Sequence, residues 1–186
     1  MPSAIEVSSV VGLIAVGALT ANILLGLLIS TGYNPLRRWP RRPVKLFTLH
    51  NWTGYLALVV AALHPAIIPF SSTAGFRVLD IVAPISSPQQ PFVNTLGAIA
   101  LYLVAFVVAT SYFRQVFGFH RWKQLHYTTY AAAAVFYAHG IVSDPLLQNR
   151  PVDWIDAEKV YVEGCALIVA AATVWRISRR RRIRSW

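Results

Sequence analysis

Four histidines lie inside long apolar stretches of the chain, in two pairs of similar spacing. His50 and His64 stand 14 positions apart, and His126 and His139 stand 13 apart. An ionisable side chain inside a membrane-spanning helix is costly and by default marks a functional site. One such histidine is readily explained as a hydrogen-bonded packing residue. Two pairs on two segments instead predict ligands, because neutral imidazole binds transition metals well.

The segments that carry these histidines are long enough to cross a bilayer. Hydrophobic residues make up 56% of the 186 residues and charged residues 13%, about half the charged fraction of a soluble domain. A bilayer core about 30 Å thick needs roughly 20 apolar residues per helix. We therefore expect an all-α integral membrane protein, a bundle of five transmembrane helices. The expected spans are 8–30, 46–70, 92–113, 124–142 and 160–177.

The distribution of charge predicts how this bundle is oriented. Fourteen of the 17 basic residues lie between spans one and two, between spans three and four, or after span five, and no acidic residue lies there. Because positive charge is concentrated in cytoplasmic loops, we expect the N-terminus outside and the C-terminus in the cytoplasm. The basic residues flank apolar spans, so the net charge of +10 indicates a membrane protein and no nucleic-acid partner.

Spans two and four run in the same direction, because one span separates them. His50 and His126 are therefore expected at one depth near the cytoplasmic side. His64 and His139 are expected about 20 Å further out, at 1.5 Å of helix per residue. Each depth then offers one imidazole from each of two helices, which is what a six-coordinate haem iron requires. The sequence thus predicts two stacked haem b groups.

Helical periodicity supports this pairing on one span but not on the other. At about 100° per residue, 14 positions bring His64 within roughly 40° of His50. Thirteen positions leave His139 roughly 140° from His126 on an ideal helix. Span four is therefore expected to be locally distorted, or to hold its haems on different sides.

Other metals fit the pattern less well, and a few further residues are candidates. Zinc and di-iron sites cluster their ligands and often use cysteines or carboxylates, whereas each depth here supplies two histidines. His120 is expected to be a solvated residue of the inner link. Candidate partners of the haem propionates are Arg114, Arg121 and Lys123 at the inner depth and Arg77 at the outer depth, although topology alone also explains these charges. No residue is predicted to be catalytic.

Four aromatic residues are expected near the middle of the membrane: Tyr102, Phe106, Tyr130 and Phe136. They are candidates for the space between the two haems. The more ordinary interpretation is that they pack in the core.

The residues around the histidines resemble the ferric reductase-like transmembrane domain family, which includes ferric-chelate reductases, NADPH oxidases and the MsrQ-type membrane subunits of bacterial methionine-sulfoxide repair. The resemblance covers residues 46–142. It rests on Leu49-His50-Asn51-Trp52-Thr53-Gly54 followed by His64, and on Phe117-Gly118-Phe119-His120-Arg121-Trp122-Lys123-Gln124-Leu125-His126 followed by His139-Gly140. It implies that His50 and His126 bind an inner haem b, that His64 and His139 bind an outer one, and that electrons pass outward.

The resemblance also implies partners and a location. Many relatives continue into flavin- and NADPH-binding domains, but we expect residues 1–186 to form a single transmembrane domain without a Gly-rich nucleotide loop. FMN or FAD is then expected on a cytoplasmic reductase partner. The external acceptor would be a ferric chelate, oxygen or a periplasmic oxidoreductase. The chain would be the membrane haem subunit of an oxidoreductase in a bacterial inner (plasma) membrane.

Two alternatives remain open from the sequence. A quinol-linked membrane cytochrome b also carries paired histidines on two helices, and it would take its electrons from quinol. A haem-free transporter or scaffold with polar histidine pairs would bind no haem. Reduction by quinol without a flavoprotein favours the first alternative, and a missing Soret band favours the second.

Overall fold

The computed structural model is all-helical in the part of the chain that it describes, residues 2–33, 45–71, 74–148 and 150–184. In chain order the helices are α1 (Ala4–Thr31), α2 (Leu46–Ile67), η2 (Ile68–Phe70), α3 (Val78–Val82), η3 (Pro84–Ser86), α4 (Pro91–Tyr112), α5 (Arg114–Phe117), α6 (Phe119–His126), α7 (Thr128–Val142) and α8 (Ala157–Arg184). Most of the expected basic segment between spans one and two lies outside the described residues.

Four of the described helices are long and apolar enough to cross a membrane. These are Ala4–Thr31, Leu46–Phe70, Pro91–Tyr112 and Ala157–Arg179. They correspond to expected spans one, two, three and five. The all-α membrane architecture is thus confirmed, with four candidate spans rather than five.

The expected fourth span, 124–142, is not one continuous helix. It is divided at Tyr127, because α6 ends at His126 and α7 begins at Thr128. The chain tightens there, because the Tyr127 N–H donates to the Gln124 carbonyl (3.2 Å) and the Tyr130 N–H to the Tyr127 carbonyl (3.1 Å), bonds of the 3₁₀ type. This break is a local distortion, one of the two outcomes expected from the 13-residue histidine spacing.

Local sequence explains where the long helices begin and end. The Ser3 hydroxyl accepts from the Glu6 N–H (3.2 Å) and the Glu6 carboxylate accepts from the Ser3 N–H (2.7 Å), a capping box that starts α1. Gly32 ends α1 with φ of 67°, a left-handed conformation that glycine adopts without strain. Pro91 occupies the first turn of α4, where its missing N–H costs no helical bond.

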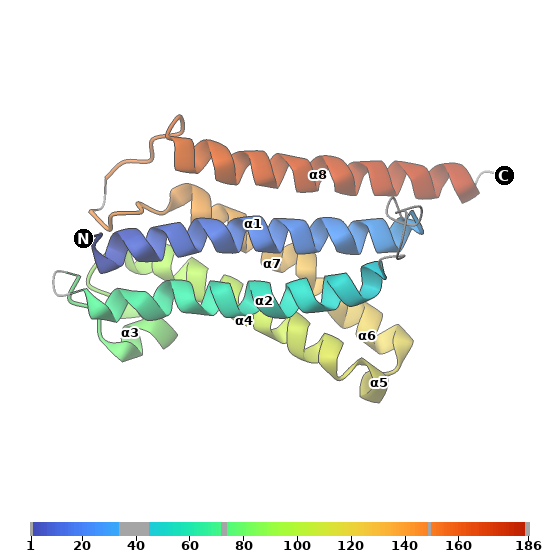
Figure 1. Cartoon of the computed structure of the whole chain (residues 1–186), viewed down its shortest axis with the longest axis horizontal. Coiled ribbons are helices and arrows are strands. Elements are labelled where there is room, and N and C mark those ends of the chain that lie inside the picture. The colour runs from blue at the N-terminus through green and yellow to red at the C-terminus, as the bar shows by residue number, and fades with distance from the viewer. Residues whose placement is uncertain (1, 34–44, 72–73, 149, 185–186) are drawn as a thin grey trace.

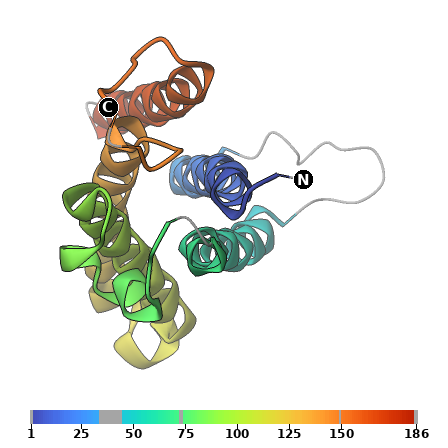
Figure 2. The same ribbon diagram turned by 90° about the vertical axis from the view of Figure 1, so that its left-hand side faces the viewer.

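The helices form two facing pairs with a fifth helix beside them. α1 packs against α2, and α4 packs against α7. In the end view, α1 and α2 lie on one side and α4 and α7 on the other, while α8 contacts both α1 and α7 (Figure 2). A buried cluster joins α1, α7 and α8; its members are Val16, Tyr137, Val162, Cys165 and Val169. We call the space between the α1–α2 pair and the α4–α7 pair the seam.

The direction of the helices sets the levels along the seam. α2 and α7 run the same way, and α1, α4 and α8 run the opposite way (Figure 1). α3 lies at the end where α1 begins, and α5 and α6 lie at the end where α8 finishes (Figure 1). Residues early in α2 therefore share a level with the α6–α7 junction, and residues late in α2 share one with the end of α7.

Candidate functional site

The structure brings the four histidines together in two pairs along the seam. The ring centroids of His50 and His126 lie 6.3 Å apart, with ring planes at 81°. Those of His64 and His139 lie 6.4 Å apart, with planes at 64°. These are the pairs that the spacing predicts. That they bind haem stays a prediction.

Both separations fit a metal ion held between two imidazoles. Two rings that bind one ion from opposite sides have centroids about 6 Å apart, because each metal–nitrogen bond is about 2 Å long and the nitrogen lies about 1 Å from the ring centre. Among the described residues, no three or more His, Cys, Asp or Glu side chains gather into a group that could hold a metal ion. The donor set is therefore two imidazoles at each level, which suits haem, because the porphyrin supplies the remaining four nitrogens.

A neighbouring helix holds each imidazole through Nδ1. A main-chain carbonyl lies within hydrogen-bond distance of three of the rings: that of Asn22 (3.1 Å, to His50), of Ser8 (2.7 Å, to His64) and of Val93 (2.9 Å, to His139). The Ser8 hydroxyl is also 3.2 Å from Nδ1 of His64, and the Ser111 hydroxyl is 3.2 Å from Nδ1 of His126. A carbonyl oxygen only accepts, so Nδ1 carries the proton in the first three. Metal-binding histidines commonly donate through the second ring nitrogen in this way, which fixes the tautomer. In His50, His64 and His139 this leaves Nε2 unprotonated and able to bind a metal ion.

Glycines on α1 and α4 make room for three of the rings. A Cβ would lie 2.9 Å from Nδ1 of His64 if built on Gly12, 3.2 Å from Cε1 of His50 if built on Gly26, and 2.8 Å from Cε1 of His139 if built on Gly97. Contacts this short do not occur without a shift of the ring or the helix. Each glycine lies one helical turn after the residue whose carbonyl accepts the Nδ1 hydrogen bond. Carbonyl and glycine together form what we call a cradle.

The cradles are the part of the site that the sequence analysis missed. Gly12 and Gly26 stand 14 positions apart, which is the spacing of the histidines on the antiparallel helix α2. Since two helices side by side repeat their contacts at equal axial distances, this matching interval was a signal in the sequence. On α4, Ser111 stands 14 positions after Gly97 and occupies the corresponding place at the inner level.

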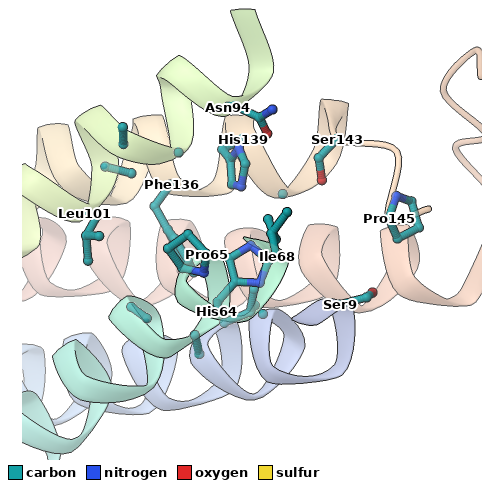
Figure 3. Close-up of a pocket in the computed structure, with 18 of the residues that line it drawn as sticks. Ser9, His64, Pro65, Ile68, Asn94, Leu101, Phe136, His139, Ser143 and Pro145 are labelled. Carbon is teal, nitrogen blue, oxygen red and sulfur yellow. The ribbon is translucent and has the colours of Figure 1, made fainter. Parts of the chain in front are cut away.

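Two cavities lie along the seam, an outer one at the level of His64 and His139 and an inner one between the two histidine levels, whose lining includes neither His50 nor His126. The outer cavity has a volume of about 160 Å³ and is lined by His64 and His139, which point toward each other from opposite walls (Figure 3). The smaller inner cavity, about 50 Å³, is lined by Asn22 and Gly54 among others. Phe136 lines both cavities and so lies between the two levels.

The other three mid-depth aromatics lie elsewhere. Tyr102, Phe106 and Tyr130 are 48%, 43% and 39% exposed, which places them at the surface of the bundle. Of the four candidates for the space between the levels, the structure therefore brings Phe136 alone to that position.

The candidate propionate partners lie outside both cavities. Arg114 is half-buried, with its guanidinium carbon 4.6 Å from the centroid of the Phe47 ring. Lys123 lies over a phenylalanine ring of its own helix, at 5.6 Å. Arg121 is exposed, and Arg77 is exposed at the start of α3. None of these four basic residues is among the described residues that line a cavity, so their pairing with propionates stays a prediction.

A buried lysine that the sequence analysis did not single out caps the helix that carries His139. Lys159 of α8 is 5% exposed. Its ammonium donates to the carbonyls of Gly140 (3.2 Å) and Ser143. Carbonyls at the end of a helix have no partner within it, so α8 supplies one to α7. Lys159 also lines the outer cavity.

Beside this cap, Asp144 organises the loop that follows α7. Its carboxylate accepts from the Arg150 guanidinium (2.9 Å) and from the main-chain N–H groups of Leu146, Gln148 and Arg150. The Arg150 guanidinium, with these N–H groups, holds the pKa of the Asp144 carboxyl well below its usual value. The Gln90 side chain also bonds both main-chain polar groups of Asp144. Asp144, Pro145 and Leu147 also line the outer cavity.

Comparison with known protein families gives one result that bears on these pairs. Residues 11–137 match the family described as ferric reductase like transmembrane component. The matched range contains His50, His64 and His126, and His139 lies two positions beyond its end. No curated protein and no solved structure gives a significant match. Because the family match covers well over half of the chain, the resemblance is confirmed, and the chain belongs to the ferric reductase-like transmembrane component family.

Proposed function

We propose that this chain carries electrons across a membrane through two haem b groups. The observation that supports the proposal most directly is the two-histidine pair at each level, with the centroid separation that one metal ion between the rings requires. Membership of the family indicates membrane electron transfer. When bound, haem supplies an iron that takes up and releases one electron.

His50 and His126 are the proposed inner ligands, and His64 and His139 the proposed outer ligands. The Nδ1 hydrogen bonds orient each ring and keep its proton on the atom that does not bind iron. The cradle glycines allow α1 and α4 to approach the rings closely. The walls of the outer cavity are mostly apolar. In this way the protein supplies ligands, spacing and a surround of low dielectric constant.

We propose that α6 and α7 together make a fifth crossing of the membrane. The 15 residues of α7 reach about 22 Å at 1.5 Å per residue, which is short of a hydrocarbon core of about 30 Å. α6 adds the missing length on the far side of the break at Tyr127. The proposed orientation has the N-terminus outside and the C-terminus in the cytoplasm of a bacterial cell. It is supported by Arg114, Arg121 and Lys123 at one end of the seam.

The proposed electron donor is a cytoplasmic reductase that carries FMN or FAD, so that the flavin belongs to the partner. The proposed acceptor is a ferric chelate, oxygen or a periplasmic oxidoreductase. Anaerobic addition of quinol to the purified protein tests the donor. Full reduction of the haems by quinol without a flavoprotein would show that quinol, and not a flavin reductase, is the electron donor.

The decisive experiment is haem quantification with reduced-minus-oxidised spectra on purified variants. The wild type is expected to contain two haems per chain. His64→Ala and His126→Ala should each lose at least one. His120→Ala is the matched control, because His120 is exposed on α6 and belongs to neither pair, and it should keep both haems.

Two results would contradict the proposal. A full haem complement in both His64→Ala and His126→Ala would refute the ligand assignment. A wild-type protein that is folded and lacks a Soret band would refute haem binding as a whole, and would favour a transporter or scaffold.

A further inference from the structure

The cradle of His126 differs from the other three. At the other three histidines a main-chain carbonyl accepts from Nδ1, and a glycine follows that carbonyl's residue one helical turn later. At the inner end of α4 the corresponding position holds Ser111, whose hydroxyl oxygen lies 3.2 Å from Nδ1 of His126. At His126 a side-chain hydroxyl therefore takes the place that a main-chain carbonyl has beside Nδ1 of the other three histidines.

Trp122 of α6 takes part in the same contact. Its indole nitrogen lies 3.4 Å from the Ser111 hydroxyl oxygen, and its ring lies over that of His126, with centroids 5.2 Å apart and planes at 32°. An indole N–H only donates, so the Ser111 oxygen accepts from Trp122. Ser111, Trp122 and His126 thus form a small polar network. A serine hydroxyl also lies 3.2 Å from Nδ1 of His64, but there the Ser8 carbonyl accepts at 2.7 Å and the Ser8 hydroxyl donates to the His64 carbonyl.

The direction of the second bond follows if His126 binds iron, and to that extent the inference rests on the proposed function. Iron on Nε2 leaves the proton on Nδ1, which then donates to Ser111. The Ser111 oxygen thus accepts from both Nδ1 and Trp122. The strength of such an outer acceptor sets how basic a ligating histidine is. A hydroxyl oxygen that also accepts from an indole is a weaker acceptor than a main-chain carbonyl, because an amide oxygen carries more negative charge than a hydroxyl oxygen.

We propose that Ser111 and Trp122 are positioning residues that tune the inner haem separately from the outer one. Ser111 orients the His126 ring, and Trp122 limits how strongly the serine oxygen accepts from it. A less basic imidazole favours ferrous over ferric iron. The pair therefore holds the inner reduction potential above the value that a carbonyl acceptor would give.

Spectroelectrochemical titration of the full-length protein tests this assignment. His64→Ala identifies which of the two one-electron waves belongs to the inner haem. Ser111→Ala removes the acceptor and should move the inner wave to a more positive potential, by about tenfold in the reduction equilibrium (59 mV for one electron). Trp122→Phe removes the competing donor and should move it the other way. Ser111→Thr keeps the hydroxyl and should restore the wild-type value.

Ser30→Ala is the matched control, because the Ser30 hydroxyl donates to the Leu27 carbonyl of its own helix and Ser30 belongs to neither histidine pair. It should move neither wave. Unshifted waves in a two-haem Ser111→Ala protein would overturn the inference, as would equal shifts of both waves. If Ser111→Ala loses its inner haem, Trp122→Phe decides: a negative shift supports the inference, and an unshifted inner wave overturns it. A wild type without haem would instead refute the proposed function itself.

Discussion

Gly97 of α4 and His139 of α7 pack so closely that no side chain fits between them. A Cβ on residue 97 would lie 2.8 Å from Cε1 of the ring and 3.0 Å from each ring nitrogen. Because Nδ1 of the same ring is bonded to the Val93 carbonyl at 2.9 Å, the ring has little freedom to move away. The position of this imidazole is thus fixed from two sides by one turn of α4.

Gly97→Ala should therefore displace His139 and release the outer haem. We expect haem per polypeptide to fall to about half of the wild-type value, because a misplaced ligand would empty one of the two haem sites. Gly164→Ala is the matched control, because a Cβ there meets nothing within 4 Å. An unchanged haem content in Gly97→Ala would show that the outer ring does not need this cradle.

Asp144→Asn should destabilise the protein at neutral pH, because the carboxylate accepts a guanidinium and three main-chain N–H groups. The expected loss in the free energy of unfolding is about 1.5–3 kcal/mol, which is usual for hydrogen bonds to charged groups. The native pKa lies below the ordinary value of 3.8, so the carboxylate stabilises the fold above pH 3.8. That stabilisation shrinks as the pH falls further and is lost below the native pKa.

Thermal unfolding of both proteins in detergent between pH 3 and pH 7 measures this effect. The gap in unfolding temperature between wild type and Asp144→Asn should be constant from pH 7 to about pH 5 and should begin to narrow as the pH falls toward 3. A gap that is independent of pH would show that the charge of Asp144 contributes nothing.

Lys159→Met should weaken the attachment of α8 to the end of α7. The substitution keeps the apolar stem and removes the donor to the carbonyls of Gly140 and Ser143. Leaving such buried acceptors unpaired costs about 1–3 kcal/mol. The midpoint of thermal unfolding should fall, and Lys159→Arg, which keeps a donor, should recover part of the loss. Equal stability of the Met and wild-type proteins would argue against the cap.

The hydrogen bond between the hydroxyls of Thr20 and Tyr137, 2.8 Å long, should couple α1 to α7. A double-mutant cycle with Thr20→Ala and Tyr137→Phe isolates this term. We expect a coupling of about 0.6 kcal/mol, the average for hydrogen bonds between membrane helices, measured as resistance to unfolding in detergent. A coupling of zero would mean that α1 and α7 are held by apolar packing alone.

The proposed orientation predicts which positions a membrane-impermeant thiol reagent reaches in intact cells. With the single native cysteine replaced (Cys165→Ser), Ser86→Cys on η3 should be labelled from outside. Ser178→Cys near the end of α8 should be labelled only after the membrane is permeabilised. Both serines are exposed, and the reverse pattern would invert the topology.

The amino-acid sequence determined the spans and the pairing of the histidines. Long apolar runs are unfavourable in water, and the thickness of the bilayer sets the length of a helix that crosses it. The helices α1, α2, α4 and α8 were therefore predictable. Because helices alternate in direction, the order of spans also placed His50 beside His126 and His64 beside His139. The ring separations agree with that pairing.

Tertiary packing decided where the fourth segment breaks and what surrounds each ring. No glycine or proline marks residue 127, so only the 13-residue histidine spacing hinted that α6 and α7 are separate helices. Residues on different helices meet in the cradles, in the contact of Ser111 with His126 and in the Lys159 cap. Such contacts depend on how helices rotate and approach one another, and apolar faces that meet lipid leave little periodic signal of that rotation in the sequence.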